Sequence, residues 1–296
     1  MKPRAKEWLA LAALLVVCIV WGSTFVVVKD AVERMPVLDF LAWRFAIAAL
    51  AMLAIRPRAV AQLGSAGRRR GLWLGVALGV GYVTQTFGLQ HTSASVSGFI
   101  TGLFVVFTPL IAALLLRRRV GVAAWIAVVL ATAGLALLSL HGFAIGFGES
   151  LTVLTAIAFA AHIVGLGEWS AGRDPVGLAI VQLLVVVVMC GVPAVASGIS
   201  MPPDAGVWGA LALTAIAGTA LAFLAQTWAQ AHLSPTRTAV VLTMEPVFAG
   251  IFGVAVGGDD FGLRTAAGAL LVLVAMLLVE LGPRRGAEGA VERLEA

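Results

Sequence analysis

Long apolar runs, separated by short polar segments, make up almost the whole of this 296-residue chain. An α-helix needs about 20 apolar residues to cross the hydrocarbon core of a bilayer, which is about 30 Å thick. The runs lack the alternation of apolar and polar residues that is typical of the strands of a membrane barrel. The pattern therefore predicts an all-α membrane protein with ten transmembrane helices, over residues 8–28, 37–55, 71–89, 94–116, 120–140, 149–167, 176–197, 206–230, 236–256 and 262–281.

The composition requires lipid as the solvent. Hydrophobic residues make up 61% of the chain and charged residues only 12%, whereas soluble domains have about 45–50% and about 25%. The first run, 8–28, is too long for the apolar part of a signal peptide, and no cleavage site follows it. We therefore expect this run to stay in the protein as its first helix.

The basic residues predict the orientation. Sixteen of the 20 Lys and Arg residues fall in segments on the side of the N-terminus, and three, Lys29, Arg34 and Arg264, fall on the other side. Since cytoplasmic loops are enriched in Lys and Arg, we expect both termini in the cytoplasm and the chain in the inner (plasma) membrane. The same clusters account for the net charge of +5, and no basic face with interleaved aromatic residues indicates nucleic-acid binding.

An internal repeat divides the chain. Gln85-Thr86, followed by His91 and Ser93, recurs 141 residues later as Gln226-Thr227, followed by His232 and Ser234. Pro109 is matched by Pro246 at a slightly shorter spacing. We predict one five-helix domain over residues 1–141, a second over 142–282, and a cytoplasmic tail over 283–296. An odd number of spans in each domain inverts the second relative to the first, as in many secondary transporters.

Several motifs resemble those of one family. Trp21-Gly22-Ser23-Thr24-Phe25, Arg44-Phe45, the segment 88–95 and Glu245-Pro246-Val247-Phe248-Ala249 are similar to the pattern of the EamA family, in the drug/metabolite transporter superfamily. The resemblance covers residues 8–281. It implies ten spans, cytoplasmic termini and export or exchange of small organic solutes. The loops at Arg117–Arg119 and at Gly258–Asp260 depart from the family pattern.

Two charged residues lie within predicted spans. A charge at the centre of a transmembrane helix costs about 2.5–3.5 kcal/mol on insertion scales, so that such residues face a bundle interior or a wet cavity. Arg44 and Glu245 therefore either bind the solute, form a switchable ion pair, or form a permanent structural pair. Glu245 can also carry a coupling proton. His162, within the sixth span, is expected to be neutral and hydrogen-bonded.

Other polar and aromatic residues complete a candidate solute site. Pro109 and Pro246 each remove a helical hydrogen bond, which predicts helix breaks at related places in the two domains. The amides of Gln85 and Gln226 either join helices or contact the solute. We expect aromatic walls and hydroxyl groups from Trp21, Thr24, Tyr82 and Trp228. Gly71, Gly75 and Gly79 form a small-residue face that favours close helix packing.

These features favour a secondary transporter of amino acids, related metabolites or drugs that works by alternating access. No nucleotide-binding motif of the Walker type is present, and neither a metal site nor a cofactor is predicted. An intramembrane enzyme is one alternative, although no catalytic constellation is found; a receptor or structural protein is another. The partners expected are the bilayer, a small solute and, if transport is coupled, protons. A monomer and a homodimer both fit the sequence.

Overall fold

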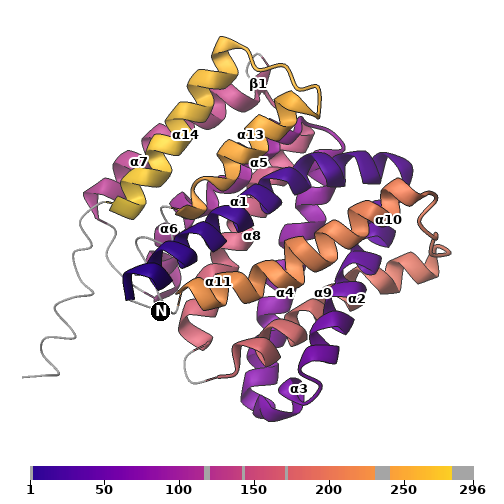
Figure 1. Ribbon diagram of the computed structural model, residues 1–296. Helices are drawn as coiled ribbons and strands as arrows, with labels where there is room; N and C mark the ends of the chain where they lie inside the picture. Colours follow the sequence, from indigo (N-terminus) through magenta and orange to yellow (C-terminus); the bar gives the residue numbers. More distant parts are fainter. Residues whose placement is uncertain (1–2, 117–120, 142–143, 171–172, 231–240, 282–296) are drawn as a thin grey trace, which may run out of the picture.

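The computed structural model describes residues 3–116, 121–141, 144–170, 173–230 and 241–281. Parts of the sequence analysis fall outside these residues: Arg117–Arg119, His232, Ser234, the start of the ninth predicted span, and the tail 283–296. The helices are tilted together into one bundle (Figure 1).

The first half of the described chain contains α1 (Pro3–Arg34), α2 (Val37–Ile55), the short α3 (Ala59–Gln62), α4 (Gly64–Leu89), α5 (Ala94–Gly102), α6 (Phe104–Leu116) and α7 (Val122–Ser139). Two short antiparallel strands follow, β1 (Leu140–His141) and β2 (Ala144–Ile145). The second half contains α8 (Phe147–Trp169), α9 (Pro175–Ala196), α10 (Ala205–Ala212), the π-helix η1 (Leu213–Leu221), α11 (Ala222–Gln230), α13 (Glu245–Ala255) and α14 (Leu263–Leu281).

The predicted all-α membrane class is confirmed. Seven helical segments of the described chain are long and apolar enough to span a bilayer: Lys6–Arg34, Val37–Ile55, Gly64–Leu89, Ala94–Leu115, Phe147–Trp169, Pro175–Ala196 and Ala205–Gln226. Three shorter apolar helices cover Val122–Leu138, Glu245–Ala255 and Leu263–Val279. The chain is thus a multi-pass membrane protein.

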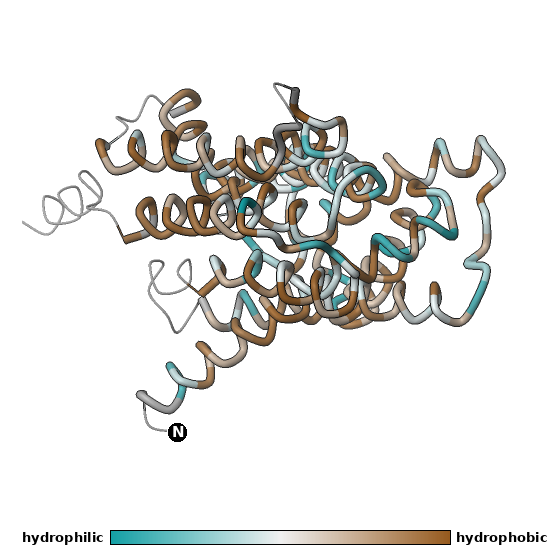
Figure 2. Tube along the Cα trace, turned by 90° about the horizontal axis from the view of Figure 1, so that it is seen from above, coloured by the Kyte–Doolittle hydropathy of each residue, from teal (hydrophilic) through white to brown (hydrophobic). Residues whose placement is uncertain are grey.

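The outer surface of the bundle is apolar, as a lipid environment requires. Side chains such as Leu263, Leu114 and Val122 expose 89%, 79% and 76% of their surface. Figure 2 shows hydrophobic colour along most of the helices, and hydrophilic colour where they end and toward the middle of the bundle. Buried charged residues, among them Arg44, lie inside the bundle, as the cost of exposing charge to lipid dictates.

Close helix packing depends on the glycines that the sequence singled out. A Cβ on Gly71, Gly75 or Gly79 would lie within 2.8 Å of a side chain of α9, so that the predicted packing role of this face is confirmed. Gly22 likewise lets α1 approach α13 closely, because a Cβ added at this position would lie 2.5 Å from the Cβ of Phe248 in α13. These contacts hold together the helices that enclose the centre of the protein.

Candidate functional site

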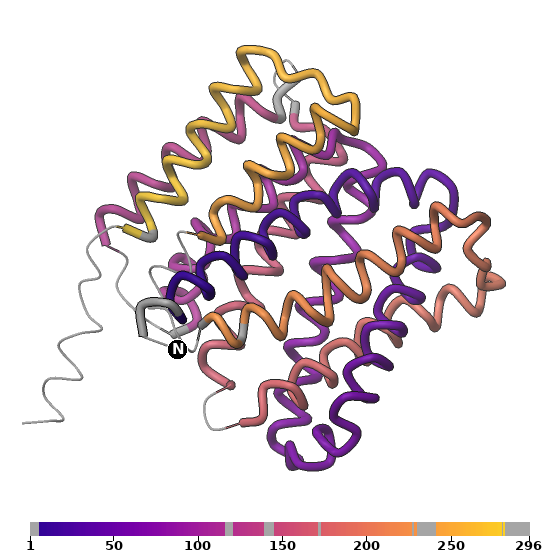
Figure 3. The backbone as a smooth tube through the Cα atoms, in the orientation of Figure 1, coloured from indigo at the N-terminus to yellow at the C-terminus, as the bar shows by residue number. Residues whose placement is uncertain are grey.

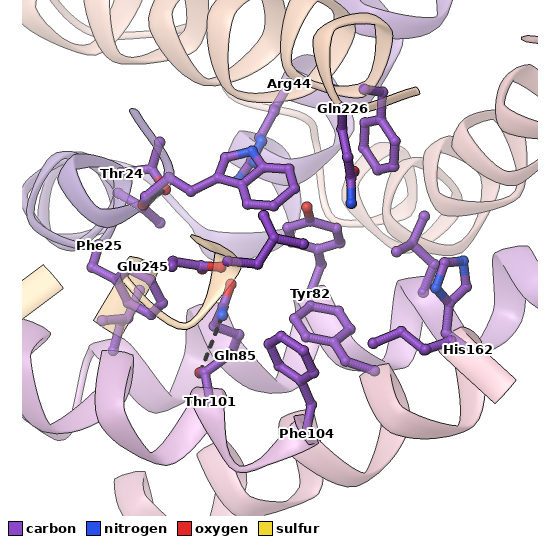
Figure 4. A pocket seen from close by; sticks show the side chains of 18 of the residues that line it. Thr24, Phe25, Arg44, Tyr82, Gln85, Thr101, Phe104, His162, Gln226 and Glu245 are labelled. Atoms are coloured by element: carbon purple, nitrogen blue, oxygen red, sulfur yellow. Dashed lines mark hydrogen bonds between the residues drawn. The ribbon is translucent and has the colours of Figure 1, made fainter. Parts of the chain in front are cut away.

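A cavity of about 190 Å³ lies among α1, α2, α4, α5, α8, α11 and α13 (Figure 4). Seven of the eight predicted solute-contacting residues line it: Trp21, Thr24, Arg44, Tyr82, Gln85, Gln226 and Glu245. They come from helices that are far apart in the sequence. The eighth, Trp228, lies two residues beyond Gln226, about half a helical turn away, and lines a neighbouring cavity instead.

Arg44 is held at one side of this cavity. Its Cζ lies 4.9 Å from the ring centroid of Tyr82 and 5.3 Å from that of Phe45, distances at which an aromatic ring attracts a cation. Its Nη2 donates a hydrogen bond of 3.5 Å to Thr219. The Nε of Arg44 is sealed among its neighbours and has no hydrogen-bond partner among the described residues, so the guanidinium is only partly satisfied.

Glu245 lies elsewhere on the cavity wall, at the start of α13. The sequence analysis placed it within the predicted span 236–256, next to a helix break at Pro246; in the structure it is the first residue of α13. Its side chain is half-buried and forms neither a hydrogen bond nor an ion pair with any residue that the structure describes. In particular, Glu245 and Arg44 are not paired with each other. Figure 4 shows the carboxylate next to Gln85.

The helix breaks lie near the predicted prolines but not at them. Pro109 is inside α6, which continues through it; the interruption is at Leu103, between α5 and α6. Pro246 lies in the first turn of α13, just after the interruption at Thr243-Met244. Because Pro246 has no N–H group, it leaves the carbonyl of Leu242 without its helical donor, and Leu242 lines the cavity.

The π-helix η1 supports the cavity in a way that the sequence did not reveal. The carbonyl of Gly218 accepts a hydrogen bond of 2.7 Å from Nε1 of Trp21. The hydroxyl of Thr219 donates a hydrogen bond to the carbonyl of Thr214 and accepts one from Arg44. A π-helix is rare and frequently marks a functional site. Here the wider turn presents two successive residues to the solute-lining side chains of α1 and α2.

The remaining wall is aromatic and amide-bearing. Nε2 of Gln85 donates a hydrogen bond of 3.3 Å to Thr101, so that this amide both joins helices and faces the cavity. The sequence analysis missed three phenylalanines, Phe104, Phe159 and Phe223, because an apolar residue in an apolar helix carries no local signal. Phe159 packs edge-on against Tyr82, with ring centroids 5.3 Å apart.

A second cavity, of about 380 Å³, adjoins the first. Both cavities are lined by Leu78, His162, Leu166 and Phe223. The second extends past Trp228 to Ser170 and Pro175, where α8 ends and α9 begins. We call it the vestibule, because it extends from the wall shared with the central cavity toward one end of the bundle.

Fold and site together define a multi-pass membrane protein that encloses, within its helices, a cavity of solute size with largely apolar walls and a few polar side chains. The chain matches the model of the EamA-like transporter family over residues 8–140 and again over 146–281. It belongs to the EamA-like transporter family, within the drug/metabolite transporter superfamily, as the sequence motifs implied. Membership indicates a membrane transporter rather than an enzyme.

Two curated relatives are uncharacterized transporters from Archaeoglobus fulgidus. One is 33% identical over 269 residues, covering 90% of this chain and 84% of the relative. The other is 24% identical over 282 residues, covering 93% of this chain and 98% of the relative. A crystal structure with 17% identity superposes with a TM-score of 0.64, covering 97% of this chain and 99% of that one. That similarity concerns the fold alone.

Proposed function

We propose that this protein is a secondary transporter that exports or exchanges small organic solutes by alternating access. The observation that carries the proposal is the central cavity. It presents one carboxylate without a partner among the described residues, Glu245, and one buried guanidinium, Arg44, separately on an aromatic wall. A zwitterionic solute with an apolar body, such as an amino acid or a related metabolite, complements this arrangement.

Desolvation explains why such charges bind a solute strongly. A charged group that is removed from water costs free energy until it finds a partner, and Arg44 and Glu245 have not neutralised each other. A solute ammonium group can pair with Glu245 while its carboxylate pairs with the guanidinium of Arg44. Hydrogen bonds of this charge-assisted kind contribute about 1.5–3 kcal/mol each.

The inverted repeat is supported by the positions of the helix breaks. Leu103 and Met244 are 141 residues apart, the same spacing as Gln85 and Gln226. The family model matches twice, over 8–140 and 146–281. We propose that five helices from residues 1–141 and five from 142–282 form two halves with opposite orientation, which is an architecture suited to alternating access.

Alternating access is further supported by a difference between the two ends of the cavity. At one end, α4 packs against both α1 and α2. Nζ of Lys29 donates to the carbonyl of Thr92 at 2.7 Å, and the hydroxyl of Thr92 donates to Glu149 at 2.8 Å. At the other end, α11, which corresponds to the later part of α4 in the repeat, has no extensive contact with α8 or α9 among the described helices. The vestibule opens there.

The open end is proposed to face the cytoplasm. In Figures 1 and 3, the start of α1 and the end of α14 lie at the same end of the bundle, together with α3. Arg56, Arg58, the Arg68–Arg70 run and Arg173 belong to the segments at this end. Their clustering supports cytoplasmic termini in the inner membrane, and therefore a site that is open to the cytoplasm in this conformation.

The proposal is tested by flux in proteoliposomes. The purified protein is reconstituted, and efflux of labelled L-leucine, L-phenylalanine and phenethylamine is measured with and without a pH gradient. Saturable efflux that Glu245→Gln reduces is the expected result, and a response to the gradient separates proton coupling from facilitated exchange. Fluxes equal to those of protein-free liposomes, for these and a wider panel of amines and amino acids, would overturn the proposal.

A further inference from the structure

His162 stands at the junction between the two cavities. It extends from α8 and lines both the central cavity and the vestibule. Figure 4 places it across the central cavity from Glu245, with Tyr82 between them. The imidazole ring therefore belongs to the wall that the two cavities share.

A short chain of hydrogen bonds determines which nitrogen of His162 carries the proton. Nε2 of Gln182 donates to the carbonyl of Leu178 at 3.0 Å. Because a carbonyl can only accept, the amide NH₂ of Gln182 must point to Leu178 and its Oε1 to His162. That Oε1 lies 2.5 Å from Nε2 of His162, and since Oε1 is also only an acceptor, Nε2 must be protonated.

The other ring nitrogen is then a free acceptor. His162 is 7% exposed and forms no ion pair with any described carboxylate, so we treat the ring as neutral. A neutral imidazole protonated at Nε2 has a lone pair at Nδ1. Among the described residues, Nδ1 has no hydrogen-bond partner, yet it is not one of the sealed, unsatisfied atoms. It is therefore accessible, on a residue that lines both cavities.

The vestibule provides surroundings for the body of a solute. Its walls are mainly aliphatic, and Phe223 and Trp228 add aromatic surface. Among the residues that line it, Gln182 is engaged with His162 and Leu178. Nδ1 of His162 is thus a polar group that is both fixed in orientation and unoccupied. A ligand with an apolar body and an N–H donor fits this combination.

We propose that the vestibule is a second binding site for the transported solute. Nδ1 of His162 accepts a hydrogen bond from an N–H group of an amine or amino acid, and Gln182 is the residue that positions the ring. This inference rests on the proposed function, because it assigns the same solute to both cavities. A solute held at His162 is then transferred to Glu245 in the central cavity.

The first experiment observes the ring directly. The protein, labelled with ¹⁵N-histidine, is placed in lipid nanodiscs, and His91→Gln and His162→Gln variants assist assignment. We expect a neutral ring with Nε2–H and unprotonated Nδ1 for His162. L-Leucine, L-phenylalanine and phenethylamine are then added in turn, and the Nδ1 signal should shift as it accepts a hydrogen bond. A ring protonated at Nδ1, or no shift with any of the three, would overturn the proposal.

The second experiment uses a matched pair of variants. In His162→Asn, the side-chain amide lies near the position of Nδ1 and keeps an acceptor there; in His162→Gln, the amide lies near Nε2 and Nδ1 is lost. We expect the half-saturation concentration for efflux to rise about fivefold in His162→Gln, as for the loss of one hydrogen bond, and less in His162→Asn. His91→Gln, remote from both cavities, should have no effect. Equal values for both His162 variants and the unmutated protein would contradict the proposal.

The two experiments separate this inference from the proposed function. Efflux without a shift at His162 leaves the transporter assignment intact and removes the vestibule site. A shift at His162 without any efflux supports the site and removes transport. Gln182→Leu adds a test of positioning: the ring should lose its preference for Nε2–H while the protein still elutes as a single species.

Discussion

Leu103 and Met244 occupy the same position in two interrupted helices. The amide of Leu103 donates to the carbonyl of Ile100 at 3.1 Å, and that of Met244 donates to the carbonyl of Val241 at 3.0 Å. After each interruption the α-helical pattern resumes, from Phe107 to the carbonyl of Leu103 and from Phe248 to that of Met244. The backbone therefore repeats its hydrogen bonds at the same spacing as the sequence landmarks.

The equivalence between the two breaks ends at the side chains. Phe104 follows the first break and Glu245 follows the second, and both line the central cavity. The repeat thus places an apolar ring at one position and a carboxylate at its counterpart. This asymmetry makes Glu245 the natural residue to test first.

We predict that Glu245→Gln slows solute flux while the protein still inserts into the membrane. Loss of a charge-assisted hydrogen bond, about 1.5–3 kcal/mol, corresponds to about a tenfold to hundredfold weaker interaction. The measurement is efflux of L-phenylalanine and phenethylamine from proteoliposomes, since both carry an ammonium group. Glu33→Gln, at the end of α1 and remote from both cavities, is the control. Unchanged flux would exclude Glu245 from the mechanism.

Arg44→Gln should discriminate between those two solutes. L-Phenylalanine and phenethylamine share an ammonium group and an aromatic body, but only the amino acid has a carboxylate for the guanidinium of Arg44. We expect the half-saturation concentration to rise about tenfold or more for L-phenylalanine and to change little for phenethylamine. An equal loss for both solutes would instead assign Arg44 a structural role through Thr219 and Tyr82.

Thr92→Val should weaken the closed end of the cavity. The variant has the same shape as the original residue but cannot donate to Glu149, which is 6% exposed. A lost hydrogen bond to a charged group, about 1.5–3 kcal/mol, would shift the population toward conformations that open at this end. The measurement is labelling of Thr24→Cys, in a background without Cys18 and Cys190, by an impermeant maleimide added outside.

We expect the cysteine at position 24 to be labelled faster in the Thr92→Val variant than in the parent protein, which keeps Thr92. Thr132→Val serves as a control, because Thr132 is exposed and bonds only within its own helix, to the carbonyl of Val128. If both variants are labelled at the rate of the parent, the bond between Thr92 and Glu149 does not contribute to closure.

Gly22→Val should destabilise the bundle at the α1–α13 contact. A Cβ at Gly22 would lie 2.8 Å from the backbone nitrogen of Ala249, and overpacking of this kind costs about 1–3 kcal/mol. Gly167→Ala is the matched control: its Cβ would meet no atom within 4 Å, and Ala favours a helix by about 0.5–1 kcal/mol over Gly. Melting temperatures in detergent should fall for the first variant and not for the second.

The sequence by itself determined the elements and their solvent. A lipid environment favours long apolar helices and disfavours charged side chains. Both effects depend on short stretches of sequence, so they can be deduced from composition and spacing. The same reasoning identified Arg44 and Glu245 as interior residues. The order of motifs along the chain was sufficient to indicate the family.

Only the tertiary structure decided how these residues meet. The rotation of each helix about its axis is set by contacts with helices that are distant in the sequence. Those contacts direct Trp228 into the vestibule and Gln226 into the central cavity, and leave Arg44 and Glu245 without an ion pair between them. The breaks at Leu103 and Met244 likewise differ from the prolines in position, by six residues from Pro109 and by two from Pro246, because a helix ends where packing and hydrogen bonding together favour it.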